Sequence, residues 1–286
     1  MNILSNPKWL QEFQFPYQGF EAIPESIFSS INDDLDRLQT DAPLVSIIIA
    51  AWNEEVNILR CVASLSKTKT TIPLEIIVVN NNSTDNTAQT LEQLHVKTFF
   101  QGIQGWGPAR QKGMENAKGK YILLADADCY YPENWVTEMV AALQKDGVAC
   151  VYGRYAFIAE AGYPRWKLFL LEKMKNVIAE VRHFKRPYLN AYGMSMGFGR
   201  EYGMKIGFVM HKIRGEDGRM CFDLMQYGGV KQVKSGKAVV WTNPRSIQQD
   251  GSFTRAVGNR IVREIKRFSS MFVPHRPHDT KTSTNE

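Results

Sequence analysis

Two aspartates, Asp126 and Asp128, end a nearly continuous apolar run from Tyr121 to Ala125. The run predicts a strand buried on both faces, and residues i and i+2 of an extended chain point to the same side. Two carboxylates at a buried strand end need a cationic partner, and their oxygens suit a hard divalent cation that keeps part of its shell for water and phosphate. The pattern therefore predicts a metal and diphosphate site, with an exposed turn as the alternative.

The elements that must position these acids alternate between strands and helices. Apolar, β-branched runs predict strands over 44–51, 74–79, 96–100 and 121–125, and helical spacing follows each of the first three. Such alternation implies an α/β fold with a mostly parallel sheet flanked by helices and right-handed crossovers. Polar side chains follow the first, second and fourth strands. The carboxyl edge of the sheet is therefore the candidate nucleotide site.

Local signals set the expected ends of several elements. Asn53 is expected to cap the first helix, with Glu54 and Glu55 in its first turn, and Pro108 suits the first turn of the helix that carries Arg110. The other expected elements are helices over 84–94, 135–143, 164–183 and 219–225, strands over 148–157 and 238–242, and a strand or loop punctuated by glycines over 192–199.

Composition shifts divide the chain into four parts. Residues 1–42 are expected to form an irregular arm on the main domain, which spans 43–250. Residues 251–272 predict a basic amphipathic helix, in which an apolar stripe begins at Val257 and basic residues surround it. The polar residues 273–286 predict a disordered tail.

The overall composition limits the classes of protein and partner. With 44% hydrophobic and 22% charged residues the chain is typical of globular proteins, and a net charge of +6 does not imply nucleic acid. Four separated cysteines form no Cys-x-x-Cys pair, no basic and apolar leader opens the chain, and no apolar run approaches the roughly 18 residues of a membrane span. A cytoplasmic protein is expected. The helix at 253–272 suits two roles: packing on the domain with its basic face in solvent, or contact with the inner face of the membrane.

Five short motifs together resemble the family 2 glycosyltransferases of GT-A fold. They are Ser46–Glu55, Asn82–Asp85, Gly107–Arg110, Asp126–Asp128 and Gly215–Asp217, in this order over roughly 44–225. The resemblance implies an inverting enzyme that takes a sugar from a nucleoside diphosphate donor, most often uridine diphosphate, with Mg²⁺ or Mn²⁺. It also implies a nucleotide-binding half over 43–130 and an acceptor half over 131–250.

The resemblance assigns the donor residues by position. Glu54 and Asp85 match the residues that hold the base and ribose, and Ala50 matches a backbone contact at the strand end. Arg110 matches a basic residue of the donor site, although Gln111 replaces the family's asparagine beside it.

The resemblance also assigns the reacting groups. Asp126 and Asp128 match the motif that binds the metal and the diphosphate, and Asp217 matches the general base. Glu216 and the stretch from Gly193 belong to the acceptor side. The Gln-x-x-Arg-Trp box of processive members is absent from the sequence, which favours one transfer per encounter to a glycan or lipid-linked acceptor.

Several alternatives remain at this stage. The helix dipole alone favours acidic residues at the start of a helix, whatever their function. Asp85 would cap its own helix whether or not it binds a nucleotide. A catalytically silent relative would serve as a membrane-associated assembly subunit. A sugar-phosphate nucleotidyltransferase is disfavoured, because the loop at 51–55 is acidic and lacks glycine.

Overall fold

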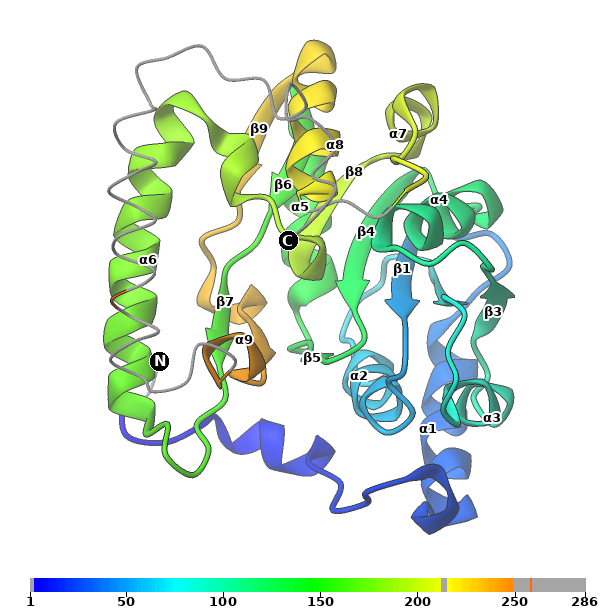
Figure 1. The fold of residues 1–286 in the computed structure, drawn as a ribbon. Helices are drawn as coiled ribbons and strands as arrows, with labels where there is room; N and C mark the ends of the chain where they lie inside the picture. Colours follow the sequence, from blue (N-terminus) through cyan, green and yellow to red (C-terminus); the bar gives the residue numbers. More distant parts are fainter. Residues whose placement is uncertain (1–2, 212–214, 249–257, 259–286) are drawn as a thin grey trace.

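The fold is built on a seven-stranded sheet with the strand order β3-β2-β1-β4-β8-β6-β9 (Figure 1). The computed structural model describes residues 3–211, 215–248 and 258. Strands β3, β2, β1 and β4 are mutually parallel, and β8 is antiparallel to both of its neighbours. The mixed sheet with flanking helices confirms the predicted α/β fold class.

The strands of both sheets have the following bounds: β1 Val45–Ala51, β2 Leu74–Asn80, β3 Lys97–Phe100, β4 Tyr121–Asp126, β5 Cys129–Tyr130, β6 Val148–Tyr152, β7 Tyr155–Phe157, β8 Met196–Gly199, β9 Gly229–Gln232 and β10 Val240–Thr242. The α-helices are α1 Glu25–Leu38, α2 Asn57–Ser66, α3 Thr87–Glu92, α4 Trp106–Asn116, α5 Trp135–Leu143, α6 Arg165–Lys185, α7 Arg200–Ile206, α8 Glu216–Leu224 and α9 Arg245–Gln248.

Helices cover both faces of the large sheet because its central strands are apolar on both sides. In β1, Ile47 and Ile49 pack toward α1, α2 and α5, whereas Ile48 packs toward α4 and α8. The expectation of strands buried on both faces is thus confirmed. The carboxyl ends of β1, β2 and β4 remain as the edge where loops can form a site.

A second, three-stranded sheet with the order β5-β10-β7 lies beside the first. Thr242 of β10 pairs with Cys129 of β5, directly after Asp128. This pairing brings α9, near the end of the described chain, to the carboxyl end of β4. The sequence did not predict this approach.

Three local expectations were wrong. Asn53 does not cap a helix: its φ is 54°, and α2 begins only at Asn57, so Glu54 and Glu55 lie in the preceding loop. The expected strand over 148–157 is two strands, which belong to different sheets. The turn after β4 contains Asp128, so the two aspartates do not continue one extended strand.

The first 42 residues are more regular than expected. They contain α1, which buries Phe28, Ile31 and Leu35, and two short 3₁₀ helices, Lys8–Phe13 and Phe20–Ala22. Leu10 and Phe13 join the same apolar core as α2 and β1. The predicted helix over 251–272 and tail over 273–286 fall outside the described residues, apart from Gly258.

Candidate active site

Arg110 is the centre of the site. Its side chain is 3% exposed, and its guanidinium contacts three carboxylates. Nη2 donates to Oδ1 of Asp126 at 3.0 Å, and Nη1 donates to Oε1 of Glu216 at 2.9 Å. Nη1 also bonds to Oδ1 of Asp217. One buried cation therefore joins the end of β4 to the start of α8.

Helix α4 places Arg110 at this point because its other residues anchor it on the sheet. Ala109 and Met114 are buried in the core between α4, α8 and the sheet. Gly113 lies so close to Ile48 of β1 that an added Cβ would overlap the Ile48 side chain. The helix is thus held tightly against β1, and its arginine points toward the carboxyl edge.

Asp217 is held from two directions. Its Oδ1 is bonded to Arg110, and its Oδ2 accepts a hydrogen bond of 2.8 Å from the amide of Gly193. The side chain stays 17% exposed, so it can still be approached. Each carboxylate oxygen has two lone pairs, which leaves capacity to accept a proton. A fixed, partly exposed carboxylate of this kind can act as a general base.

Asp126 is fixed through both its backbone and its side chain. In the sheet register it lies beside Ala50 of β1. Its amide donates to the Tyr131 hydroxyl at 2.8 Å, and that hydroxyl donates to the carbonyl of Met194 at 3.0 Å. Tyr131 therefore connects the end of β4 to the segment that carries Gly193, a role that the sequence analysis missed.

Burial and neighbouring charges raise the pKa of two acids of this cluster, Asp126 and Glu216. Burial, together with the charges of Asp128 and Asp217, raises the pKa of Asp126 to about 7, although Arg110 opposes the shift. Burial and Asp217 likewise raise the pKa of Glu216. Burial disfavours the charge on Arg110, but the surrounding carboxylates outweigh it and raise the pKa of its guanidinium. Three carboxylates therefore share one buried guanidinium.

A second ion-paired group lies beside the first. Nη1 of Arg245 is 3.1 Å from Oε1 of Glu54 and 4.0 Å from Oδ2 of Asp128. Burial raises the pKa of Glu54, and the charge of Asp128 adds to the shift. Glu54, Asp126 and Asp128 therefore form one electrostatically coupled group at the carboxyl edge. No sequence pattern selects Arg245, because its place depends on the pairing of β10 with β5.

The carboxylate oxygens at this edge of the sheet fit a hard divalent cation as ligands. Asp126 and Asp128 offer carboxylate oxygens, and their side chains are 26% and 28% exposed. Within the described residues no group of three or more His, Cys, Asp or Glu side chains is arranged to enclose a metal. Mg²⁺ often uses one or two carboxylates and completes its shell with water and phosphate oxygens. The two aspartates suit an ion of that kind.

The two loops that carry Glu54 and Asp85, the predicted contacts to the nucleotide base and ribose, are hydrogen-bonded to each other. The side chain of Asp85 accepts from the amide of Thr87 at 3.0 Å and from the amide of Glu55 at 3.3 Å. The side chain of Asn53 accepts from the amide of Thr84 at 2.8 Å. Asp85 thus bonds to the first residue of α3 and also ties that loop to the loop of Glu54. Its nucleotide contact stays a prediction.

The structure brings the predicted residues together in two adjoining sets. Arg110, Asp126, Glu216, Asp217 and Gly193 form the first, and Glu54 and Asp128 meet through Arg245 in the second. The predicted role of Arg110 in the donor site remains a prediction. Its terminal nitrogens bond to carboxylates in this structure.

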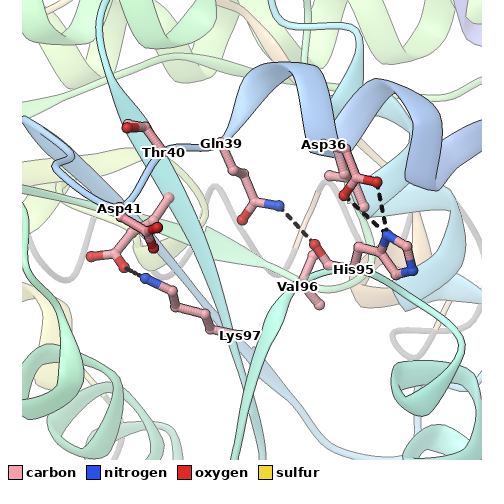
Figure 2. A pocket seen from close by; sticks show the side chains of 9 residues that line it. Asp36, Gln39, Thr40, Asp41, His95, Val96 and Lys97 are labelled. Carbon is pink, nitrogen blue, oxygen red and sulfur yellow. Dashed lines mark hydrogen bonds and ion pairs between the residues drawn. The ribbon is translucent and has the colours of Figure 1, made fainter.

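A pocket of about 370 Å³ lies at the opposite, amino-terminal edge of the sheet (Figure 2). Its polar groups bond to one another: Nδ1 of His95 is 3.0 Å from Asp36, and Nζ of Lys97 is 2.6 Å from Oε2 of Glu75. Gln39 donates to the carbonyl of His95 at 2.7 Å. These contacts join α1 to β2 and β3, so the pocket is part of the structural support of the sheet.

Sequence comparison identifies related proteins. The family model for "Glycosyl transferase family 2" matches residues 46–204. Chondroitin synthase of Escherichia coli is 26% identical over 210 residues, which are 67% of this chain and 30% of that protein. Glycosyltransferase AglE of Haloferax volcanii is 30% identical over 150 residues, 48% of this chain and 49% of that protein. The matches thus span between about a third and a half of these two relatives.

Structural comparison finds the same fold in distant enzymes. A mannosyltransferase of Pyrobaculum calidifontis in complex with GDP-Man and Mn²⁺ superposes with a TM-score of 0.55 at 15% identity, covering 87% of this chain and 81% of that one. TarS 1-349 of S. aureus in complex with UDP-GlcNAc gives a TM-score of 0.53 at 20% identity, covering 70% of this chain and 58% of that one. At these identities the likeness concerns the fold.

Proposed function

The chain belongs to glycosyl transferase family 2, and on that premise we propose that it transfers a sugar from a nucleoside diphosphate donor to a hydroxyl of a glycan or lipid-linked acceptor, with inversion at the sugar carbon. The donor is proposed to be a uridine diphosphate sugar. Residues 43–130 are the nucleotide-binding half and residues 131–250 the acceptor half. The setting is the cytoplasm or the inner face of the membrane.

The observation that carries the proposal is the cluster around Arg110. It joins Asp126, from the half assigned to the donor, to Glu216 and Asp217, from the half assigned to the acceptor. A transferase needs these two functions at one point, because the acceptor oxygen must reach the sugar carbon as the diphosphate leaves. A binding protein has no need for a partly exposed carboxylate held in this way beside the donor site.

Each residue has a distinct task in the proposed reaction. Asp126 and Asp128 would hold a Mg²⁺ or Mn²⁺ ion, which would supply charge neutralisation for the diphosphate. Ala50 contacts the donor through its backbone, and Glu54 and Asp85 hold the base and ribose. Arg245 adds positive charge next to Asp128, and the metal would compete with it for that carboxylate.

The transfer itself is a single displacement. The acceptor oxygen forms a bond to the anomeric carbon from the face opposite the leaving group, and the bond from that carbon to the phosphate oxygen breaks. The diphosphate leaves with the electron pair, and the acceptor's proton passes to Asp217. Arg110 and the amide of Gly193 keep Asp217 in place, and Glu216 lies beside it on the acceptor side. Positioned proton transfer contributes about 10² to 10⁴ in rate.

The first experiment identifies the donor. Thermal unfolding of the full chain is followed with a panel of nucleoside diphosphate sugars, each with and without Mn²⁺. A donor that binds the folded form raises the unfolding temperature, and we expect the largest rise for one uridine diphosphate sugar with Mn²⁺ present. The same donor is then tested for release of the nucleoside diphosphate. Binding without turnover, with every acceptor class offered, would favour the silent assembly subunit over the enzyme.

A further inference from the structure

Helix α6 carries an apolar stripe on its outer side. Trp166, Leu170, Val177, Val181 and Phe184 are 47%, 59%, 65%, 47% and 87% exposed. At 100° per residue these five positions fall within an arc of about 60° on the helix surface, and they extend over about 27 Å of its length. Large apolar side chains gathered on one exposed face mark an interaction surface.

The opposite side of α6 fixes the direction in which the stripe points. Leu168 and Leu171 are buried, together with Phe157 of β7 and Ile247 of α9. Arg165 and Glu172 form a buried ion pair of 2.7 Å on the same side. The stripe therefore faces away from the domain. Helix α6 itself lies at the outer edge of the molecule (Figure 1).

The charges of α6 are predominantly positive. Both of its acids are already paired with basic residues, Glu172 with Arg165 and Glu180 with Arg154 and Lys234. The other charged residues of the helix are basic: Lys167, Lys173, Lys175, Arg182 and Lys185. Of these, Lys173 and Lys185 are exposed beside the stripe. An apolar face with a cationic border complements an anionic lipid surface.

We propose that α6 docks the protein on an anionic membrane surface, with Trp166, Leu170, Val177, Val181 and Phe184 in the boundary between headgroups and acyl chains. The helix lies in the plane of the membrane, because within the described residues no helix has the length and apolarity to cross a bilayer. From Phe184 the chain continues through the 3₁₀ helix Pro187–Asn190 to Gly193. Docking therefore brings the acceptor side of the site close to the lipid surface.

Two other candidate partners for the apolar stripe complement the basic residues of α6 less well. A second copy of the chain would place the same lysines against each other across the shared stripe. The segment at 253–272 of this chain contributes Arg260, Arg263, Lys266 and Arg267, which have the same sign as the border of α6. Like charges at close range are destabilising, so the anionic lipid surface is favoured.

The test exploits the burial of the native cysteines. Cys61, Cys129, Cys150 and Cys221 are all buried, so an introduced surface cysteine can be labelled selectively. Phe184→Cys and Val177→Cys in the full chain receive an environment-sensitive fluorophore, and Met204→Cys on α7, at a residue 38% exposed, is the control. Vesicles of phosphatidylglycerol and phosphatidylcholine are compared with vesicles of phosphatidylcholine alone.

We expect a blue shift, and quenching by lipid-borne nitroxides, at positions 177 and 184 with the anionic vesicles only, and no change at position 204. Salt should weaken the effect because it screens the lysines. The double variant Leu170→Glu/Val177→Glu should bind the vesicles at least about tenfold more weakly, because it removes apolar burial. Met204→Glu should bind as the parent does. Both substituted positions are exposed, so thermal unfolding should stay unchanged.

Three results would overturn the proposal. The protein could fail to bind anionic vesicles. It could bind them while the labels on α6 remain in water, which would assign the contact to another segment such as 253–272. The labels could also shift with rising protein concentration in the absence of lipid, which would assign the stripe to a second copy.

Discussion

Gly193 lies directly against the guanidinium of Arg110, and a Cβ added at Gly193 would overlap Nη2 and Cζ of that arginine. The amide of the same glycine donates to Oδ2 of Asp217 at 2.8 Å. Only a residue without a side chain can make this hydrogen bond and still leave room for Arg110 to reach Asp126 and Asp217. A backbone position thus determines the geometry of three charged groups.

Gly193→Ala is therefore expected to displace Arg110 and loosen Asp217. Overpacking of this kind costs about 1–3 kcal/mol, and a shift of about 1 Å at a reacting group can cost about 10²-fold in rate. The variant should transfer sugar at least about tenfold more slowly, as measured by release of the nucleoside diphosphate with acceptor present, and it should unfold at lower denaturant concentration.

Gly236→Ala is the matched control for this change, because an added Cβ there meets nothing within 4 Å. It should leave both rate and stability as they are. A Gly193→Ala protein with the parent's rate would show that the contact with Arg110 does not position Asp217.

Asp217→Asn should remove transfer and leave donor binding intact. The amide keeps an oxygen for the hydrogen bond from Gly193 but cannot take up the acceptor's proton. We expect the turnover rate to fall about 10²- to 10⁴-fold, with the donor dissociation constant, measured by calorimetry with Mn²⁺, nearly unchanged. Asp223→Asn on the same helix, where Asp223 pairs with Arg219 at 3.4 Å, is the control. Normal transfer by Asp217→Asn would disprove the assignment of the general base.

Asp128→Ala should abolish the response to metal. In the parent chain, a chelator is expected to stop transfer, and added Mn²⁺ should restore it, because the ion neutralises the diphosphate as it leaves. The variant should stay at the rate of the chelated parent across a Mn²⁺ titration. Asp33→Ala on the exposed face of α1 serves as the control. A parent rate that is indifferent to the chelator would exclude the metal role of this pair.

The lowered pKa of Glu75 predicts that the free energy of unfolding depends on pH, independently of catalysis. Burial alone would raise the pKa of this fully buried carboxylate, but hydrogen bonds from Lys97, Ser46 and the amide of Lys118 outweigh burial and hold it below the ordinary value of 4.5. A depressed folded pKa gives stabilisation that is complete above the unfolded value and is lost as the pH falls through the folded one.

Glu75→Gln should accordingly lower the free energy of unfolding by about 1–3 kcal/mol near neutral pH, and the difference from the parent should shrink toward about pH 3. Urea unfolding at a series of pH values measures this. Glu92→Gln, at an exposed position of α3, is the control and should show no such trend. A constant difference across the series would mean that the charge of Glu75 is not what stabilises β2 and β3.

The sequence by itself determined the order and type of the main elements, because these follow from hydrophobic periodicity within short segments. The helix expected over 135–143 has the bounds of α5, and the strand that ends at the two aspartates is β4. It also determined which edge of the sheet carries the acids, since parallel strands all present their carboxyl ends to the same side.

Tertiary structure decided how those acids are connected. Arg110 reaches carboxylates that are 16, 106 and 107 residues away in the chain, and Arg245 reaches Glu54 across 191 residues. At two places such tertiary contacts override the conformation that the local sequence favours. Asn53 adopts a left-handed turn because its side chain accepts from Thr84 in the neighbouring loop. Residues 148–157 divide between two sheets at Gly153, against which Ser195 packs. Periodicity reports only which face of an element is buried, so the partners across that face appear only when the chain is folded.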